Sequence, residues 1–254
     1  MPAMRTARKV CIEQTAEAAT DLAAALVKSI ICEAVAKHKA AHIALAGGTT
    51  PYALYQRLAT SATESEVPWP AAEIFFGDER DVKLDDVESN YNMAQRAMLD
   101  HLPIEPGHVH PMRGDAPDLD AAAQEYEQTI RRIVPAAGGP IPRFDLILLG
   151  MGGDGHTASL FPCTADAVNE AHKLVIAHFV PVLNRKRMTF TFPLINAARN
   201  IILLVTGDDK AEAVAGLLGS DEAVRRRLPA ARLDPTDGLL TMVFDVPAAR
   251  RIQM

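Results

Sequence analysis

The chain has 254 residues, of which 48% are hydrophobic and 23% are charged, and its formal net charge is −6 at pH 7. A chain of this length and composition buries a sizeable apolar core and needs no disulfide or metal to hold it together. An acidic chain with only 5% aromatic residues favours neither nucleic acid nor an anionic membrane as a partner.

Helical and strand patterns alternate along the chain. Apolar residues spaced three and four apart predict helices over residues 15–37, 51–59, 90–99, 117–133 and 208–218. Short apolar runs predict strands over residues 42–46, 73–76, 144–149, 174–179, 187–192, 200–205 and 241–246. This order predicts an α/β fold, a mainly parallel sheet with helices on both faces. Because no repeat or long linker interrupts it, we expect residues 1–254 to form a single domain.

Cysteine usage and the apolar runs bear on cellular location. Cys11, Cys32 and Cys163 are far apart and odd in number, which fits a reducing compartment better than a disulfide framework. No apolar run approaches the roughly 20 residues of a membrane span. The basic stretch 1–10 is not followed by the apolar core of a secretory signal. We therefore expect a cytoplasmic protein, with Cys163 as a small buried residue and not a nucleophile.

Three glycine-rich polar segments each begin where a predicted strand ends. They are GGTT at residues 47–50, GDER at residues 77–80 and GMGGDGH at residues 150–156. In open α/β sheets, ligands bind outside the carboxyl ends of the strands. The three segments are therefore expected to meet at one crevice.

The first two segments carry features of a phosphate site. Gly47 and Gly48 let backbone N–H groups approach an anion, and the hydroxyls of Thr49 and Thr50 open a predicted helix. Arg80 adds a guanidinium that matches phosphate geometry. Two alternatives stay open at this point. The first segment could be a tight turn with capping threonines, and Arg80 could pair with a neighbouring carboxylate.

The third segment satisfies the spacing GxGxxG, which also occurs in dinucleotide-binding folds. That function needs a long helix after the glycines and an acidic residue about 20 positions on. Here Pro162 stops the predicted helix after a few residues, and the next predicted strand ends in His178 and Phe179. The turn instead presents Asp154 and His156, where a histidine can serve as a general base with a carboxylate behind it. The alternative is a histidine that caps the next helix.

Two further groups of residues carry weaker signals. Arg185, Lys186 and Arg187 form the densest positive cluster of the chain. They precede a predicted strand, which places them at the opposite edge of the sheet unless that strand runs antiparallel. His108 and His110 have a spacing that could hold a metal, but no third ligand is visible nearby, so we expect no metal site.

The segments LAGGTTPYALYQRLA, FFGDERDVKLDDVESNYNMAQRAML and FDLILLGMGGDGHTASLFP resemble 6-phosphogluconolactonases, and so do FPLINAARNIILLVTGDDKAEAV and LPAARL. Together the segments cover most of residues 42–232. The resemblance extends to a wider group with glucosamine-6-phosphate deaminase and ribose-5-phosphate isomerase. It implies a modified Rossmann-like sheet with a sugar phosphate at its carboxyl edge.

The resemblance also implies roles for single residues. His156 matches the general base that activates water, and Gly47, Gly48 and Thr49 match the phosphate loop. Arg80 matches an arginine that binds substrate phosphate, and Arg187 matches an arginine that opens a strand often written RITLT. The chain departs from the pattern at residues 181–186, where many members have a Lys-Pro-Pro-like segment, and at Gly153, where many have proline.

The function implied is hydrolysis of 6-phospho-D-glucono-1,5-lactone to 6-phosphogluconate in the oxidative pentose phosphate pathway. His156 would take the proton of water and Asp154 would support the ring, with no metal or cofactor. The expected partner is thus a small sugar-phosphate lactone. The alternatives are a sugar-phosphate deaminase or isomerase on the same fold, and a non-catalytic sugar-phosphate sensor. The oligomeric state does not follow from the sequence.

Overall fold

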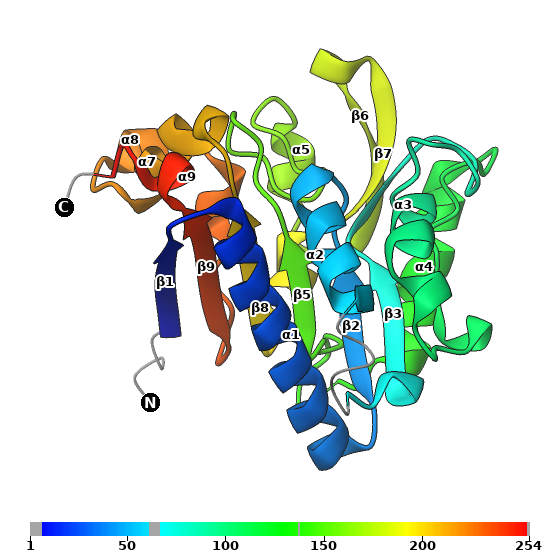
Figure 1. Cartoon of the computed structure of the whole chain (residues 1–254). Helices are drawn as coiled ribbons and strands as arrows, with labels where there is room; N and C mark the ends of the chain where they lie inside the picture. The colour runs from blue at the N-terminus through cyan, green and yellow to red at the C-terminus, as the bar shows by residue number, and fades with distance from the viewer. Residues whose placement is uncertain (1–6, 61–66, 137, 253–254) are drawn as a thin grey trace.

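The computed structural model describes residues 7–60, 67–136 and 138–252. Residues 1–6 of the basic N-terminal stretch lie outside this range. Six parallel strands form the main sheet in the order β1-β9-β8-β5-β2-β3 (Figure 1). Their bounds are Ala7–Glu13 for β1, Ala41–Leu45 for β2, Ala72–Phe76 for β3, Leu146–Leu149 for β5, Asn200–Val205 for β8 and Leu239–Asp245 for β9. The predicted mainly parallel α/β sheet is confirmed.

Helices cover both faces of this sheet. The longer ones are α1 (Ala16–His38), α2 (Thr49–Thr60), α3 (Asn90–Ala97), α4 (Leu119–Ile133) and α7 (Ala211–Leu218). The shorter α-helices of the described residues are α5 (Ala165–Val168), α6 (Phe192–Ile195), α8 (Glu222–Arg225) and α9 (Val246–Ala249). N-cap residues determine where two of the longer helices begin. Thr15 accepts the N–H of Ala18 at the start of α1, and Ser89 accepts the N–H of Asn92 at the start of α3.

The core follows from the two-residue period of the strands. Phe75 and Phe76 are neighbours on β3, so their rings point to opposite faces. The ring of Phe75 packs against Tyr126 of α4, and that of Phe76 packs against Tyr91 of α3. α4 therefore lies on one face, and α3 on the other with α1 and α2, which contact it in series. Nearly all of the buried apolar side chains join into one continuous cluster.

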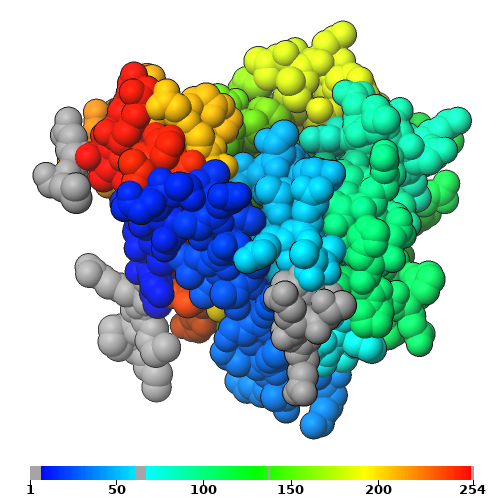
Figure 2. Space-filling model, viewed as in Figure 1, coloured from blue at the N-terminus to red at the C-terminus, as the bar shows by residue number. Residues whose placement is uncertain are grey.

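A second, smaller sheet stands above the carboxyl edge of the main one. Its antiparallel strands are β4 (Asp78–Arg80), β7 (Arg185–Phe190) and β6 (Val175–Val180). The hairpin of β6 and β7 rises beyond the main sheet, above the first turn of α2 (Figures 1 and 2). Because β7 runs antiparallel to its neighbours, its first residues lie on the same side as the three glycine-rich segments. Of the two alternatives left open for residues 185–187, the structure thus has the antiparallel one.

Other expectations differ from the structure locally. β1 was not expected, because its residues are almost all exposed and show no apolar run. The predicted short helix after His156 is wrong: residues 157–163 form turns closed by a bridge between Thr157 and Leu160. The first turn of the helix expected over 208–218 is a 3₁₀ turn at residues 208–210. Cys163 is exposed, not buried, because it lies on one of these turns.

Candidate active site

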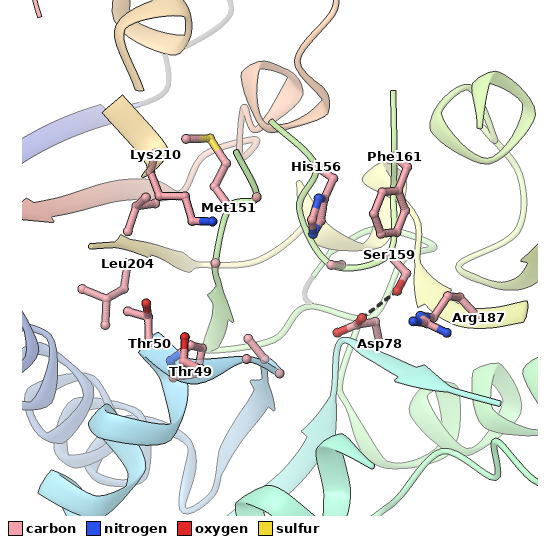
Figure 3. A pocket seen from close by; sticks show the side chains of 18 of the residues that line it. Thr49, Thr50, Asp78, Met151, His156, Ser159, Phe161, Arg187, Leu204 and Lys210 are labelled. Carbon is pink, nitrogen blue, oxygen red and sulfur yellow. Dashed lines mark hydrogen bonds between the residues drawn. The ribbon is translucent and has the colours of Figure 1, made fainter. Parts of the chain in front are cut away.

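A cavity of about 310 Å³ opens at the carboxyl edge of the main sheet, below the hairpin. Its walls come from segments that follow β2, β5 and β8, together with β4 and the hairpin. The polar lining consists of Thr49, Thr50, Asp78, Arg80, His156, Ser159, Arg187, Thr206 and Lys210 (Figure 3). The crevice expected from the ends of three strands is therefore present, and it contains all three glycine-rich segments.

The phosphate-loop segment connects β2 to α2. Gly48 has φ = 104°, which an L side chain rarely adopts, and its carbonyl accepts the N–H of Tyr52 in the first turn of α2. The buried hydroxyl of Tyr55 donates to the carbonyl of Ala46 and accepts its N–H, both at 2.8 Å. The loop is thus held from below, and the N-terminus of α2 points its partial positive charge into the cavity.

Asp154 and His156 form a hydrogen-bonded pair in the turn after β5. His156 Nδ1 lies 2.6 Å from Asp154 Oδ1, which also accepts the backbone N–H of His156 at 3.1 Å. The imidazole stacks on the ring of Phe161 at 4.2 Å between centroids. Partial burial raises the pKa of Asp154, but its hydrogen bonds with His156 more than offset this and hold the pKa below its ordinary value. An ionised Asp154 therefore orients the ring and leaves Nε2 for chemistry in the cavity.

Glycine at position 152 makes this pair possible. A Cβ atom there would lie 2.2 Å from Nδ1 of His156 and 2.7 Å from Oδ1 of Asp154. The turn closes on itself, because Gly152 donates to the carbonyl of His156 and Gly155 donates to the carbonyl of Gly152, both at 2.9 Å. A rigid turn of this kind holds the ring of His156 in one orientation.

Arg80 and Arg187 face each other across the β4–β7 pair. Like charges in directly opposite positions repel. Burial and the charge of Arg80 together lower the pKa of Arg187. Asp81 Oδ1 lies 3.7 Å from Arg187 Nη1. At this distance, the negative charge of Asp81 offsets the positive charge of Arg187 only in part. Two cations held together at a cavity wall favour the binding of an anion.

Asp78 forms a buried acidic part of the same wall. Its Oδ2 accepts a hydrogen bond from the hydroxyl of Ser159 at 2.7 Å (Figure 3). Its Oδ1 lies 3.2 Å from the amide nitrogen of Asn90. Arg187 lies beside this pair in the same view. The wall therefore offers both a carboxylate, suited to sugar hydroxyls, and cations suited to phosphate.

The structure places the residues expected from the sequence as follows. The cavity is lined by Gly47, Gly48, Thr49, Thr50, Arg80, His156 and Arg187, and Asp154 lies behind His156. Of the basic cluster, only Arg187 lines the cavity, because Arg185 Nε binds Asp81 Oδ1 at 2.7 Å on the outer side. Lys186 is exposed.

Sequence reasoning missed several lining residues. Lys210 and Thr206 follow β8, and Thr206 lies 3.0 Å from Thr50 between the two hydroxyl oxygens. The signal was available, since residues 200–205 are a predicted strand and the same rule applies to its carboxyl end. Ser159 and Phe161 carried no such signal, because their positions depend on how the turns after His156 fold.

The two histidines with metal-ligand spacing lie away from this cavity. His110 Nε2 is 2.7 Å from Oε2 of Glu73, and His108 Nε2 is 3.8 Å from Oε1 of the same carboxylate. Within residues 7–60, 67–136 and 138–252, no group of three or more histidine, cysteine or acidic side chains is placed to hold a metal ion. Across these residues, no helix is both long and apolar enough to cross a membrane.

Comparison with known proteins shows the family of the chain. Residues 13–242 match the family model described as glucosamine-6-phosphate isomerases/6-phosphogluconolactonase. A 6-phosphogluconolactonase of Synechocystis sp. is 39% identical over 227 residues, 89% of this chain and 91% of the relative. One of Mycobacterium tuberculosis is 42% identical over 195 residues, 75% of this chain and 78% of the relative.

Solved structures extend the likeness to the fold. The structure of 6-phosphogluconolactonase from Trypanosoma brucei superposes with a TM-score of 0.84 at 29% identity, covering 98% of this chain and all of that one. The family model and the structural superposition thus both extend over most of the chain. The chain belongs to the glucosamine-6-phosphate isomerase/6-phosphogluconolactonase family.

Proposed function

We propose that the chain hydrolyses 6-phospho-D-glucono-1,5-lactone to 6-phosphogluconate, a step of the oxidative pentose phosphate pathway. The observation that carries the proposal is the Asp154–His156 pair, held by a rigid turn inside a cavity with a helix N-terminus and several cations. The relatives named above are 6-phosphogluconolactonases, which supports the same reaction.

In the proposed mechanism, the N–H of His156 Nδ1 donates a hydrogen bond to the ionised Asp154, so that Nε2 carries the lone pair. Nε2 takes a proton from water as the water oxygen attacks the lactone carbonyl, and Asp154 stabilises the imidazolium that forms. The tetrahedral intermediate collapses with release of the ring oxygen, which receives the proton from His156. Backbone N–H groups of the glycine-rich turns are the candidate donors that stabilise the negative charge developing on the intermediate.

The phosphate group supplies binding energy away from the reacting carbon. We assign it to Gly47, Gly48, Thr49 and Thr50 at the start of α2, with Arg80, Arg187 and Lys210 as the cations of the cavity. Lys210 Nζ lies 2.7 Å from the carboxylate of Asp209, so its charge is held near the rim. Fixing the phosphate holds the lactone ring in place against His156.

A coupled assay tests this function. Glucose-6-phosphate dehydrogenase generates the lactone in solution, and 6-phosphogluconate formation is followed above the rate of spontaneous hydrolysis. We expect acceleration at catalytic concentrations of the chain. A folded chain that gives no acceleration contradicts the proposal.

The family description also includes glucosamine-6-phosphate isomerases, which keeps a second candidate in view. Release of ammonia from glucosamine 6-phosphate, without lactone hydrolysis, would favour that reaction. Tight binding of 6-phosphogluconate with no turnover of either substrate would instead indicate a sensor. The same protein preparation serves all three measurements.

A further inference from the structure

Asn90, the first residue of α3, contacts two walls of the cavity without lining it. The residue is 1% exposed, and its side chain lies between Asp78 of β4 and Gly47 of the phosphate loop. These two residues belong to segments more than thirty positions apart in the sequence. A single buried amide therefore connects the loop assigned to phosphate with the wall that carries the buried carboxylate.

The amide nitrogen of Asn90 donates hydrogen bonds to Asp78. Asn90 Nδ2 lies 2.8 Å from the backbone carbonyl of Asp78 and 3.2 Å from its Oδ1. The other carboxylate oxygen of Asp78 accepts from Ser159. Asp78 offers only acceptors here, so a rotated amide would place its oxygen against two other oxygens. The orientation of the Asn90 amide is therefore determined by Asp78.

The acceptor side of the amide faces the phosphate loop. Asn90 Oδ1 is buried and has no hydrogen-bond partner among the residues that the structure describes, and a Cβ atom on Gly47 would lie 1.9 Å from it. A buried acceptor left without a donor costs free energy. The oxygen without a donor is the one that lies directly against the backbone of Gly47.

The backbone of Asn90 is fixed as firmly as its side chain. Glu79, which is completely buried, accepts the N–H of Asn90 at 2.8 Å through Oε1. Its Oε2 accepts the N–H of Tyr91 and the hydroxyl of Ser89, both at 2.9 Å. Because Glu79 directly follows Asp78 on β4, the start of α3 and the cavity wall are locked to each other.

We infer that Asn90 is a positioning residue for the lactonase reaction, whose amide sets the spacing between Gly47 and Asp78. This inference rests on the proposed function, since that spacing determines where the sugar ring lies relative to His156. Asn90 acts through Gly47 and Asp78 and does not touch the substrate. Displacement of a reacting group by about 1 Å can cost about 100-fold in rate.

Two variants test the inference. Asn90→Ala removes both contacts, and we expect kcat/KM to fall at least about tenfold. Asn90→Asp keeps the shape and the oxygen that faces Gly47, but it places a second carboxylate against Asp78. We expect a similar loss near about pH 8 that is partly recovered near about pH 6, because a proton shared by two adjacent carboxylates restores the missing donor.

The titratable groups around this carboxylate pair are Glu79, Arg187 and Tyr55, and Tyr55 is a neutral phenol because burial raises its pKa. All three are present in the wild type, whose pH profile is therefore the reference for that of Asn90→Asp. The spontaneous hydrolysis rate is subtracted at each pH. Calorimetric titration with 6-phosphogluconate supplies a second readout that does not need turnover, and we expect weaker binding by Asn90→Ala.

Asn92 provides a matched control on the same helix. Its amide nitrogen donates to the carbonyls of Asp85 at 3.1 Å and Asp86 at 2.8 Å, so Asn92→Ala removes the same chemistry away from the cavity. We expect this variant to keep wild-type kcat and KM per folded molecule. Wild-type kinetics and product binding in both Asn90 variants would overturn the positioning role alone. A wild type that does not accelerate hydrolysis would contradict the proposed function itself.

Discussion

Two aspartate–histidine pairs lie at opposite ends of the same strand, β5. Asp145 directly precedes β5 and its carboxylate Oδ2 lies 3.2 Å from His42 Nδ1. Asp154 follows the strand and its Oδ1 lies 2.6 Å from His156 Nδ1. The side chains of the first pair are 4% and 8% exposed, and those of the second are 48% and 31% exposed. The same two residue types thus occur in different surroundings at the two ends of one strand.

The surroundings give the two pairs different roles. Asp145 also accepts the backbone N–H of His42 at 2.9 Å and faces Arg199 Nε at 3.2 Å, so it joins the starts of β2, β5 and β8. His156 instead lines the cavity and stacks on Phe161. Buried charges of the first kind must stay paired for the fold to be stable, whereas the second pair is accessible to water and substrate. Access, and not the pair itself, distinguishes a structural role from the proposed catalytic one.

The largest expected effect is that of His156→Ala on activity. Removal of a general base costs about 10²- to 10⁴-fold in kcat, and we expect a loss in this range. The unfolding free energy should change little, because the ring is partly exposed and its turn is closed by backbone bonds. Steady-state kinetics and thermal unfolding of one preparation measure both. A variant that keeps more than about a tenth of wild-type kcat would contradict the assignment of His156 as the base.

Asp145→Ala should show the opposite behaviour. It leaves Arg199 and the N–H of His42 without their buried partner, and we expect a loss of about 3–5 kcal/mol in unfolding free energy. The kcat per folded molecule should remain that of the wild type. Denaturant unfolding measures the loss. Asp234→Ala breaks the exposed pair with Arg8 and is the control, with an expected cost below about 1 kcal/mol.

Gly152→Ala tests whether the turn after β5 positions the catalytic pair. The added Cβ would collide with the ring of His156 and the carboxylate of Asp154, so we expect kcat to fall at least about tenfold. Gly107→Ala is the control, because a Cβ atom there meets nothing within 4 Å. Equal kinetics in the two variants would show that the reaction does not depend on this turn.

Acid titration gives the smallest expected effect. Burial raises the pKa of Asp145. Its hydrogen bonds with His42 and the charge of Arg199 lower the pKa by more than burial raises it, so the pKa lies below its ordinary value. Its ionised form therefore stabilises the fold above the ordinary aspartate pKa of about 3.9, and this stabilisation is lost as pH falls through the lower folded-state value. We expect Asp145→Asn to flatten the dependence of unfolding free energy on pH in this range.

Asp154→Asn serves as the comparison in that titration. The pKa of Asp154 is also held below its ordinary value, but its side chain is half exposed and solvent screens the interaction. We expect the acid slope of this variant to stay close to that of the wild type. An equal flattening by both variants would show that burial does not separate the two pairs.

Much of the candidate site could be predicted from the sequence because its signals are local. Asp154 and His156 are two residues apart in a glycine-rich turn, and their hydrogen bond needs only that turn. The phosphate-loop segment follows a strand and opens a helix, which is visible from residues 47–51 alone. The carboxyl ends of parallel strands lie at one edge whatever the strand order, so the segments meet there in any such sheet.

The rest depends on pairing between distant segments. His42 and Asp145 are separated by 103 positions, and no local pattern connects them. Arg187 reaches the cavity because β7 pairs antiparallel with β4 and β6, and the residues before this strand do not reveal in which direction it runs. The contact between Asn90 and Gly47 depends on how α3 packs against the phosphate loop, and no local sequence pattern indicates it.

By itself, the sequence determined the alternation of helices and strands, the parallel sheet and the edge at which its polar turns gather. These follow from side-chain periodicity and from the backbone freedom of glycine, which act over a few residues. Only the tertiary structure decided which arginine lines the cavity, which buried amide supports its loop and which histidine is accessible. Those outcomes depend on strand pairing and burial, which bring together residues that the chain holds far apart.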